Sequence, residues 1–300
     1  MLYAKIQEEI NMRNITVAAV QMSCSGDVGA NLKKADRMVR EAKALGGQII
    51  LLPELFETLY FCQEKMDEHF QLAAFRDQNQ AIRHFGQVAR ELEVVLPISF
   101  FEKTDTGNFN SVAVIDADGR ILGVYRKTHI PDGPGYEEKY YFQAGDTGFK
   151  VWNTRYGKIG VGICWDQWFP EAARCMALLG AEILCYPTAI GSEPVQTEVD
   201  SQSHWQLCMQ GHAAANIIPV AAANRTGIEA SPNSQLNFYG SSFITNETGQ
   251  KITEADRASE TIITANFDLD KIAEFRNFWG IYKYRKPAMY GLISQPAGES

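Results

Sequence analysis

The sequence lacks the patterns that mark metal proteins and disulfide-bonded proteins. Its six cysteines are scattered with no CxxC pair among them, which predicts neither a zinc site nor a disulfide framework. The five histidines show no metal-type pairing, because His204 and His212 have no third ligand beside them. We therefore expect a protein that holds neither a metal nor another cofactor.

Clustered positive charge and long apolar runs are also scarce. The formal net charge is −8, and Lys and Arg form no run longer than the pairs at 126–127 and 285–286, which argues against nucleic-acid binding. The start, MLYAKIQEEINMR, has glutamates where a signal peptide needs an apolar core. No stretch approaches the roughly 20 apolar residues of a membrane span. We expect a cytoplasmic protein without nucleic-acid or membrane partners.

What the chain does contain is an alternation of strand and helix patterns. Hydrophobic residues make up 45% of it, enough for a sizeable core. The apolar runs 15–22 and 48–54 predict buried strands, and the segment 32–45 between them has apolar residues every three or four positions. Gly46 and Gly47 supply the helix stop. This strand-helix-strand unit predicts a parallel start to the sheet.

The same alternation continues to the C-terminal part of the chain. Asp118 and Gly119 form a hairpin signal between two strands. No linker and no fixed-period repeat divides the sequence, so we predict one domain over 1–300, with a core at about 15–293 and a short polar leader and tail. The further predicted elements are helices near 77–93, 169–180 and 200–216, and strands at 94–101, 111–117, 120–127, 158–164, 182–187, 218–224, 241–245 and 261–267.

Three predicted strands end on residues that can do chemistry. Glu54 follows IILLP, Lys127 follows ILGVYR and Cys164 follows IGVGI. Each alone has an ordinary interpretation, as a solvated acid, a solvated strand end or a small buried residue. Functional groups of open α/β sheets gather beyond the carboxyl ends of strands, so we expect the three side chains to lie together.

Their chemistry is complementary. A thiol with an ordinary pKa of about 8.5 needs a base or a cation beside it to act as a nucleophile. Glu54 can be that base, and Lys127 can stabilise both a thiolate and the oxyanion that forms when a carbonyl is attacked. Pro170 and Glu171 predict a helix whose N-terminal end faces the same spot. We expect a lowered pKa at Cys164 and its alkylation ahead of the other cysteines.

The strings around this trio, LLPELFET, YRKTHIP and GICWDQWFPE, resemble the nitrilase (carbon-nitrogen hydrolase) superfamily over roughly 15–293. The resemblance implies a four-layer αββα sandwich of the nitrilase type and an acyl-enzyme route without metal or cofactor. It implies Glu54 as general base, Lys127 as oxyanion stabiliser and Cys164 as nucleophile. It also implies a homo-oligomer built from dimers.

A second glutamate is implied by the same resemblance. It matches Glu138 in the string EEKYYF, with the neighbouring Glu137 left as the alternative.

Longer strings, such as 127–152 and 209–216, resemble the branch of the family that hydrolyses ureido groups. This implies hydrolysis of N-carbamoylputrescine to putrescine, carbon dioxide and ammonia. The ammonium of such a substrate needs a carboxylate when it loses water, and we assign that part to Glu193 in the loop AIGSEP. Related N-carbamoyl-D-amino-acid hydrolases carry two arginines where this chain has Gln167 and Trp168, which argues for a cationic small-molecule substrate. Further residues expected in the pocket are Tyr60, Asp132, Trp165 and Trp168.

Three other functions stay open on the sequence alone. The first is another amidase of the family, acting for example on β-ureidopropionate, for whose carboxylate Arg174 is the nearest arginine after Cys164. The second is an inactive scaffold that keeps the fold. The third is a Cys-His enzyme of the papain kind, with His204 or His212 as its base. The histidines, His129 included, are more simply explained as structural hydrogen-bonding residues, because Glu54 already supplies a base.

Overall fold

The first sheet is built mostly from the N-terminal half of the chain, with β14 added from the C-terminal part. The computed structural model describes residues 13–296. Strand β1 (Asn14–Gln21) lies between β14 (Thr261–Asp268), which is antiparallel to it, and β2 (Ile49–Leu51), which is parallel. The backbone amide of Ile50 donates to the carbonyl oxygen of Val95, and the amide of Val95 donates to the carbonyl oxygen of Gln48, which joins β2 to an antiparallel group of three strands. These strands are β3 (Leu96–Lys103), β4 (Asn108–Ile115) and β5 (Ile121–Arg126).

The second sheet has a parallel centre. Its strand order is β13-β12-β9-β8-β7-β6, and β7, β8 and β9 run parallel to one another. A separate antiparallel hairpin is formed by β10 (Thr226–Ala230) and β11 (Gln235–Tyr239). The bounds of the six strands are β6 (Val151–Thr154), β7 (Gly157–Val161), β8 (Ile183–Pro187), β9 (Val220–Ala223), β12 (Phe243–Thr245) and β13 (Lys251–Glu254).

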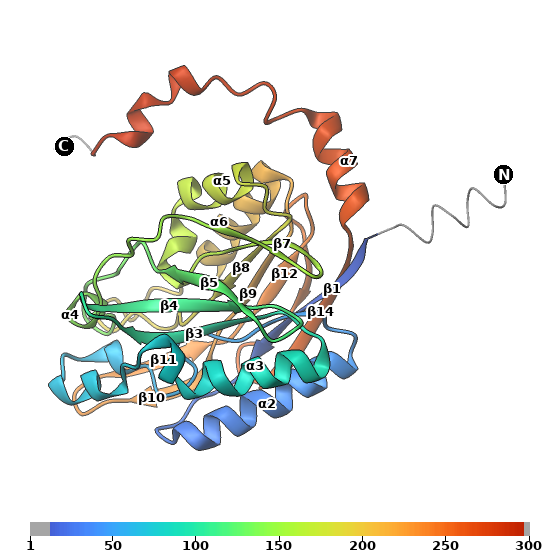
Figure 1. Cartoon of the computed structure of the whole chain (residues 1–300). Coiled ribbons are helices and arrows are strands. Elements are labelled where there is room, and N and C mark those ends of the chain that lie inside the picture. The colour runs from blue at the N-terminus through green and yellow to red at the C-terminus, as the bar shows by residue number, and fades with distance from the viewer. Residues whose placement is uncertain (1–12, 297–300) are drawn as a thin grey trace.

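Helices cover the outer face of each sheet (Figure 1). Helices α2 (Val28–Ala44) and α3 (Gln80–Leu92) lie below the first sheet in that view, and α5 (Pro170–Leu178) and α6 (Gln202–Asn216) lie on the opposite side of the molecule. The side chains of Asp27 and Asn79 cap α2 and α3 by accepting hydrogen bonds from backbone amides in the first turn. The remaining helices are α4 (Glu138–Tyr141) and α7 (Leu269–Trp279), with short 3-10 turns η1 (Phe61–Gln63), η2 (Asp67–Leu72), η3 (Arg76–Gln78), η4 (Cys164–Trp168), η5 (Pro287–Met289) and η6 (Gly291–Ser294).

Separate buried clusters hold the layers together. Val17, Val161 and Ala223 belong to the cluster that contains residues of both sheets. A second cluster joins α2 and α3 to the first sheet, and a third joins α5 and α6 to the second sheet. Because the centre of each sheet is apolar on both faces, central strands such as β2, β8 and β9 are nearly continuous hydrophobic runs rather than alternating ones. The predicted αββα sandwich is confirmed.

Most predicted elements are present, with shorter strands than the apolar runs suggested. The predicted strand 158–164 ends at Val161, and the predicted strand 48–54 ends at Leu51. The sequence did not predict β6, β10, β11, β13 or α7, whose exposed or mixed residues give weak periodicity. The polar leader at 1–12 and the end of the tail at 297–300 lie outside the described residues. Within the part that is described, no helix is both long and apolar enough to cross a bilayer.

Candidate active site

Glu54, Lys127 and Cys164 follow β2, β5 and β7, and the fold brings the ends of these strands to one place. The Nζ atom of Lys127 lies 2.8 Å from Oε1 of Glu54, and 2.8 and 2.7 Å from the two carboxylate oxygens of Glu138. Glu54, Lys127 and Glu138 are each 0% exposed. An ammonium has three protons, and here all three face carboxylate oxygens. The expected gathering of strand-end residues is therefore present in the structure.

The positive charge of Lys127 is held firmly at this position. Burial by itself would lower the pKa of Lys127, but the carboxylates of Glu138 and Glu54 outweigh it and raise the pKa above its usual range. The lysine is consequently a fixed cation rather than a proton donor at neutral pH. A fixed cation in a dry site acts strongly on any negative charge that develops beside it.

Glu138, and not Glu137, is the second carboxylate of the site. Its Oε1 atom also accepts a hydrogen bond of 2.7 Å from the hydroxyl of Tyr60. Burial and the nearby Glu54 raise the pKa of Glu138, against the effect of Lys127. Glu137 instead pairs with Lys65 at 2.9 Å, and it is partly exposed. Of the two glutamates that the sequence left open, Glu138 is therefore the one that lies against Lys127.

Glu54 keeps one oxygen without a partner. Its Oε1 atom accepts hydrogen bonds from Lys127 and, at 2.7 Å, from Nδ2 of Asn110. Its Oε2 atom is buried and makes no hydrogen bond to any described residue. A buried carboxylate oxygen with free lone pairs is costly unless a partner arrives. Oε2 is therefore the atom of Glu54 that is available to accept a proton.

Cys164 occupies a strained backbone position. Its φ angle is +39°, in a region that residues with side chains seldom adopt. The Sγ atom lies 3.7 Å from the carbonyl oxygen of Ala189. Burial and the carboxylate of Glu54 raise the pKa of the Cys164 thiol well above its usual value, although Lys127 opposes this. The predicted lowering of this pKa is wrong for the free enzyme, because a buried thiolate would lie beside a carboxylate.

The turn after Cys164 also differs from the prediction. Residues 164–168 form the 3-10 turn η4, and α5 begins only at Pro170, so no α-helix N-terminus directly follows Cys164. The buried carboxylate of Asp166 fixes this turn. It accepts hydrogen bonds from the backbone amide of Ile163 at 2.9 Å and from the hydroxyl of Tyr125 at 2.8 Å, and its Oδ1 lies 2.7 Å from Nδ1 of His129.

A cavity of about 420 Å³ reaches this site, and it is lined by Cys164 and Glu138 together with residues of three loops. Its other charged lining residues are Asp132 and Glu193, and no Lys or Arg belongs to its described lining. The rest of the lining is Pro131, Gly133, Pro134, Tyr136, Trp165, Gln167, Trp168, Ala189, Ile190, Val195, Gln196, Val199, Ser201 and His204. The cavity therefore favours a ligand with an apolar middle and a positive charge.

Comparison with known proteins identifies the family of this chain. The family model described as Carbon-nitrogen hydrolase matches residues 16–277. The chain belongs to the carbon-nitrogen hydrolase family. It is 51% identical over 292 residues to an N-carbamoylputrescine amidase from Arabidopsis thaliana, covering 96% of this chain and 98% of that one. It is 53% identical to a citrullinase from Francisella tularensis subsp. tularensis, covering 94% and 99%.

Solved structures of this family share the fold. The crystal structure of a carbon-nitrogen hydrolase from Helicobacter pylori G27 matches with a TM-score of 0.88 and 36% identity, covering 94% of this chain and 99% of that chain. Nit3 of Saccharomyces cerevisiae, a member of branch 10 of the nitrilase superfamily, matches with a TM-score of 0.76 and 26% identity, covering 91% and 97%. The α/β sandwich of this hydrolase is thus the fold of its family.

The structure separates the predicted substrate-binding residues of this hydrolase into two groups. Glu193, Asp132, Trp165 and Trp168 line the cavity. Tyr60 does not belong to that lining; it is almost fully buried, and its hydroxyl binds Glu138 instead.

The carboxylates of Glu193 and Asp132 have different surroundings. Glu193 is half-buried, its side chain has no ion-pair partner among the described residues, and burial raises the pKa of its carboxyl. Asp132 is more exposed and lies 3.8 Å from Nζ of Lys139. Glu193 is consequently the carboxylate of the cavity that has no cation of its own.

Sequence reasoning missed residues that support the catalytic groups. Asn110 donates to Glu54, and Asp166 holds the turn at Cys164. Asn110 lies in the strand run FNSVAVI, where a buried amide between apolar residues is itself a signal of a specific partner. Asp166 lies in the string CWDQW, where no pattern in the letters tells a buried carboxylate from a solvated one.

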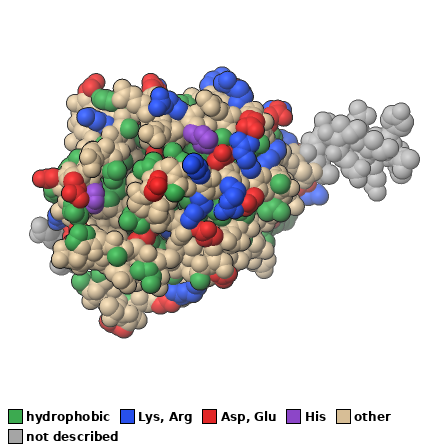
Figure 2. Space-filling view, turned by 90° about the horizontal axis from the view of Figure 1, so that it is seen from below, with side chains coloured by type: hydrophobic (Ala, Val, Ile, Leu, Met, Phe, Trp, Pro, Cys, Tyr) green, Lys and Arg blue, Asp and Glu red, His purple; other side chains and the backbone are tan. Residues whose placement is uncertain are grey.

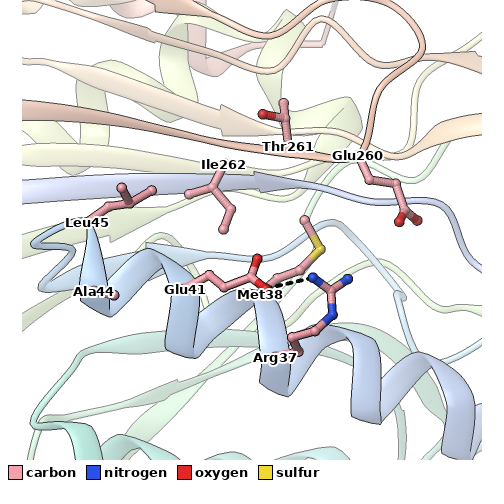
Figure 3. A pocket seen from close by; sticks show the side chains of 8 residues that line it. All are labelled: Arg37, Met38, Glu41, Ala44, Leu45, Glu260, Thr261 and Ile262. Atoms are coloured by element: carbon pink, nitrogen blue, oxygen red, sulfur yellow. Dashed lines mark hydrogen bonds and ion pairs between the residues drawn. The ribbon is translucent and has the colours of Figure 1, made fainter.

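A second groove has neither a cysteine nor a lysine in its described lining (Figure 3). It lies between α2 and β14, and its lining includes the ion pair of Arg37 with Glu41 at 2.7 Å and the side chain of Ile262. No residue of the catalytic cluster takes part in it. Figure 2 shows the molecule from below, where Lys and Arg side chains stand among acidic ones rather than in one continuous positive patch.

Proposed function

We propose that this protein hydrolyses N-carbamoylputrescine to putrescine, carbon dioxide and ammonia. The observation that carries the proposal is a cavity that ends at Cys164, has Asp132 and Glu193 in its walls and has no Lys or Arg in its described lining. Such a cavity favours a ureido compound with a distal ammonium. Relatives named N-carbamoylputrescine amidase, at 51 to 53% identity over nearly the whole chain, support the same substrate.

The first half of the reaction uses the free oxygen of Glu54. Oε2 takes the proton of the Cys164 thiol as Sγ attacks the ureido carbon, and the carbon-oxygen double bond becomes an oxyanion. The charge of Lys127 stabilises that oxyanion. The oxyanion then collapses, one nitrogen leaves with the proton held by Glu54, and an acyl-enzyme remains on Cys164.

The second half repeats the proton transfer with water. Glu54 removes a proton from water, the resulting hydroxide attacks the acyl carbon, and Cys164 leaves with the proton returned from Glu54. The product is a carbamic acid, which decomposes to carbon dioxide and an amine whichever nitrogen left first. The raised pKa of the thiol favours this concerted route, because free thiolate is scarce before the substrate arrives.

A citrulline-hydrolysing activity is the second candidate, and the relative named citrullinase is the observation that favours it. Citrulline and β-ureidopropionate both carry a carboxylate, which needs a cation when it enters a pocket. Arg174 does not supply one, because it lies over α6 with Nη2 2.9 Å from the carbonyl oxygen of Ala215 and belongs to a different cavity. We therefore rank both substrates below N-carbamoylputrescine.

The remaining alternatives lack support in the geometry. An inactive scaffold would be expected to have lost part of the cluster, whereas Glu54, Lys127 and Cys164 are all present. In a Cys-His enzyme the imidazole would contact the thiol. His212 contacts the carbonyl oxygen of Gln167 and Sγ of Cys208 rather than Cys164, and His204 packs against Trp168.

The deciding experiment offers N-carbamoylputrescine, L-citrulline, β-ureidopropionate and N-carbamoyl-D-alanine to the purified protein and follows ammonia release. We expect the highest kcat/KM for N-carbamoylputrescine. A higher kcat/KM for citrulline would replace the proposed substrate while keeping the reaction. No release from any of the four would contradict the reaction itself.

We propose Glu193 as the group that binds the distal ammonium, with Asp132 adding to the negative potential at the cavity mouth. Trp165 and Trp168 would form aromatic walls for the butyl chain. Tyr60 would act on the reaction through Glu138 rather than through the substrate.

We further propose that the chain forms one domain that assembles as a homo-oligomer built from dimers in the cytoplasm. Apolar side chains at the end of α5, on α7 and after α7 support assembly, since Leu179, Trp279 and Tyr284 are each more than half exposed. The six free cysteines are compatible with a reducing compartment. Light scattering of the full chain and cell fractionation test these two points, and a monomer or a membrane-associated pool would contradict them.

A further inference from the structure

A buried ion pair lies behind the catalytic carboxylates, outside the cavity. Arg225 lies two residues after the end of β9 in the second sheet, and Glu229 lies in β10. The Nη1 atom of Arg225 is 2.8 Å from Oε1 of Glu229, and the side chains are 0% and 2% exposed. Neither residue lines the cavity at Cys164. A pair this deeply buried needs many hydrogen bonds to offset the loss of water, so its contacts identify what it supports.

All five N–H donors of the Arg225 guanidinium are used, and four of them bind one loop. Nε and Nη2 lie 3.2 and 2.9 Å from the carbonyl oxygen of Glu54. Nη2 also donates to the carbonyl oxygen of Leu55, and Nη1 lies 3.0 Å from that of Thr58. The fifth donor is the one that faces Glu229. The guanidinium therefore fixes the backbone on which the base Glu54 stands.

This loop needs such support because it is strained. Leu55, the residue after Glu54, has a φ angle of +47°, which is unfavourable for a leucine. Strained backbone persists only where the surroundings determine it fully. The backbone amides of Glu54 and Leu55 donate to the carbonyl oxygen of Thr188 and to Oγ of Ser99, and Nδ2 of Asn31 donates to the carbonyl oxygen of Glu57. Arg225 supplies the side-chain hydrogen bonds to the carbonyl oxygens of Glu54, Leu55 and Thr58.

The partner carboxylate reaches the other half of the site. Oε2 of Glu229 accepts a hydrogen bond of 2.5 Å from the backbone amide of Tyr60, and the hydroxyl of Tyr60 donates to Glu138 at 2.7 Å. One ion pair is thus connected to Glu54 through its carbonyl and to Glu138 through Tyr60. These are the two carboxylates that hold Lys127.

We propose that Arg225 and Glu229 are positioning residues that set where Glu54 and Glu138 stand around Lys127 and Cys164. The pair touches neither substrate nor Cys164, so its effect on the reaction passes through the loop at 54–58 and through Tyr60. Displacement of a base by about 1 Å can reduce turnover by about 10²-fold without changing what the pocket binds.

The test compares Arg225→Lys and Glu229→Gln with a matched control, Gln21→Leu. A lysine has three donors in a different geometry and cannot span the three carbonyl oxygens. Glutamine at 229 keeps the size of the side chain, but it has one acceptor oxygen where Glu229 has two. Gln21 is equally buried and hydrogen-bonds to the carbonyl oxygens of Asp256 and Ser259 and to the backbone amide of Ser242, and none of these partners lies in the loop at 54–58. Its replacement should destabilise the protein without moving Glu54.

Each variant is measured for melting temperature, for kcat and KM with N-carbamoylputrescine, and for the rate at which iodoacetamide alkylates Cys164, read by peptide mass spectrometry. For Arg225→Lys we expect kcat per folded enzyme to fall by about 10²-fold with KM within about threefold, and Cys164 alkylation to slow in parallel. Glu229→Gln should lower kcat by less and in the same direction. Gln21→Leu should lower the melting temperature and leave kcat and alkylation near wild type.

Wild-type kcat and alkylation in folded Arg225→Lys would overturn the proposal, as would equal losses in Gln21→Leu, since the pair would then only add stability. If Arg225→Lys does not fold, Glu229→Gln decides by the same comparison with the control. The choice of substrate rests on the proposed function, but the alkylation rate does not. A wild-type enzyme that ignores N-carbamoylputrescine would therefore refute that function and leave this test standing.

Discussion

Replacing Glu193 with glutamine tests how the cavity recognises a cation. The change keeps the size of the side chain and its hydrogen bonding but removes the charge, so the substrate ammonium would lose its counter-ion. A charge-assisted hydrogen bond contributes roughly 1.5–3 kcal/mol. Glu193 is only half-buried and solvent screens part of its charge, which places the effect near the lower end of that range. We expect Glu193→Gln to lower kcat/KM for N-carbamoylputrescine by about tenfold.

The assay separates charge from general damage by using a neutral analogue. N-butylurea has the ureido group and a four-carbon chain but no ammonium, so its kcat/KM should hardly change in Glu193→Gln. Asp132→Asn is the matched control, because Asp132 also lines the cavity but is more exposed and lies near Lys139. The ratio of the two substrates' kcat/KM values should fall more in Glu193→Gln than in Asp132→Asn. An unchanged ratio in Glu193→Gln would refute the assignment, and a fall only in Asp132→Asn would transfer it to that residue.

The pH dependence of KM in the wild-type enzyme tests the role of Glu193 independently. Burial raises the pKa of the Glu193 carboxyl, so its negative charge is lost as the pH falls through that raised value. KM for N-carbamoylputrescine should then rise toward acid pH, and KM for N-butylurea should stay level over the same range. If both values of KM rise together, the titrating group belongs to the catalytic cluster instead of the ammonium site.

Further predictions concern the catalytic cluster and can be checked by ammonia release and peptide mass spectrometry. Cys164→Ala should abolish release while the melting temperature stays close to wild type, and an active variant would exclude the covalent route. Lys127→Ala and Glu54→Gln should each lower kcat by at least about 10²-fold, because this is the usual effect of losing oxyanion stabilisation or an acid-base group. Normal turnover in either variant would remove that residue from the mechanism. Alkylation of Cys164 should depend on Glu54, because the raised pKa of the Cys164 thiol leaves it neutral and in need of a base. An unchanged alkylation rate in Glu54→Gln would show that the thiolate forms without Glu54.

Much of the fold was predictable because its signals are local. The buried strands β1, β8 and β9 are continuous apolar runs, and α2 and α3 have both apolar periodicity and side-chain caps. The hairpin β10–β11 was not predictable in this way, since in β10 the apolar Ile228 is exposed while Glu229 is buried. Glu229 reads as a solvated acid in the sequence, and only the position of Arg225 explains why it is buried.

The residues that the structure brings together at the candidate site were predictable as a set but not as an arrangement. Strand ends located Glu54, Lys127 and Cys164, because the carboxyl ends of strands are where α/β proteins place their chemistry. The direction of the Cys164 pKa was predicted wrongly, because the balance between burial, Glu54 and Lys127 depends on distances that the sequence does not contain. The choice between Glu137 and Glu138 likewise depended on which side chain turns inward.

The raised pKa of Cys164 is consistent with efficient catalysis once the whole cluster is considered. Lys127 balances only one of two carboxylates, so creating a thiolate in advance would add a further negative charge to a buried set of groups. If the thiol proton instead passes to Oε2 of Glu54 during the attack, the proton stays inside the cluster and its total charge does not change. The negative charge moves from Glu54 to the oxyanion, next to the cation of Lys127 that is already in place. The structure therefore favours proton transfer and attack in one step, which makes the position of Glu54 more important for turnover than the acidity of the thiol.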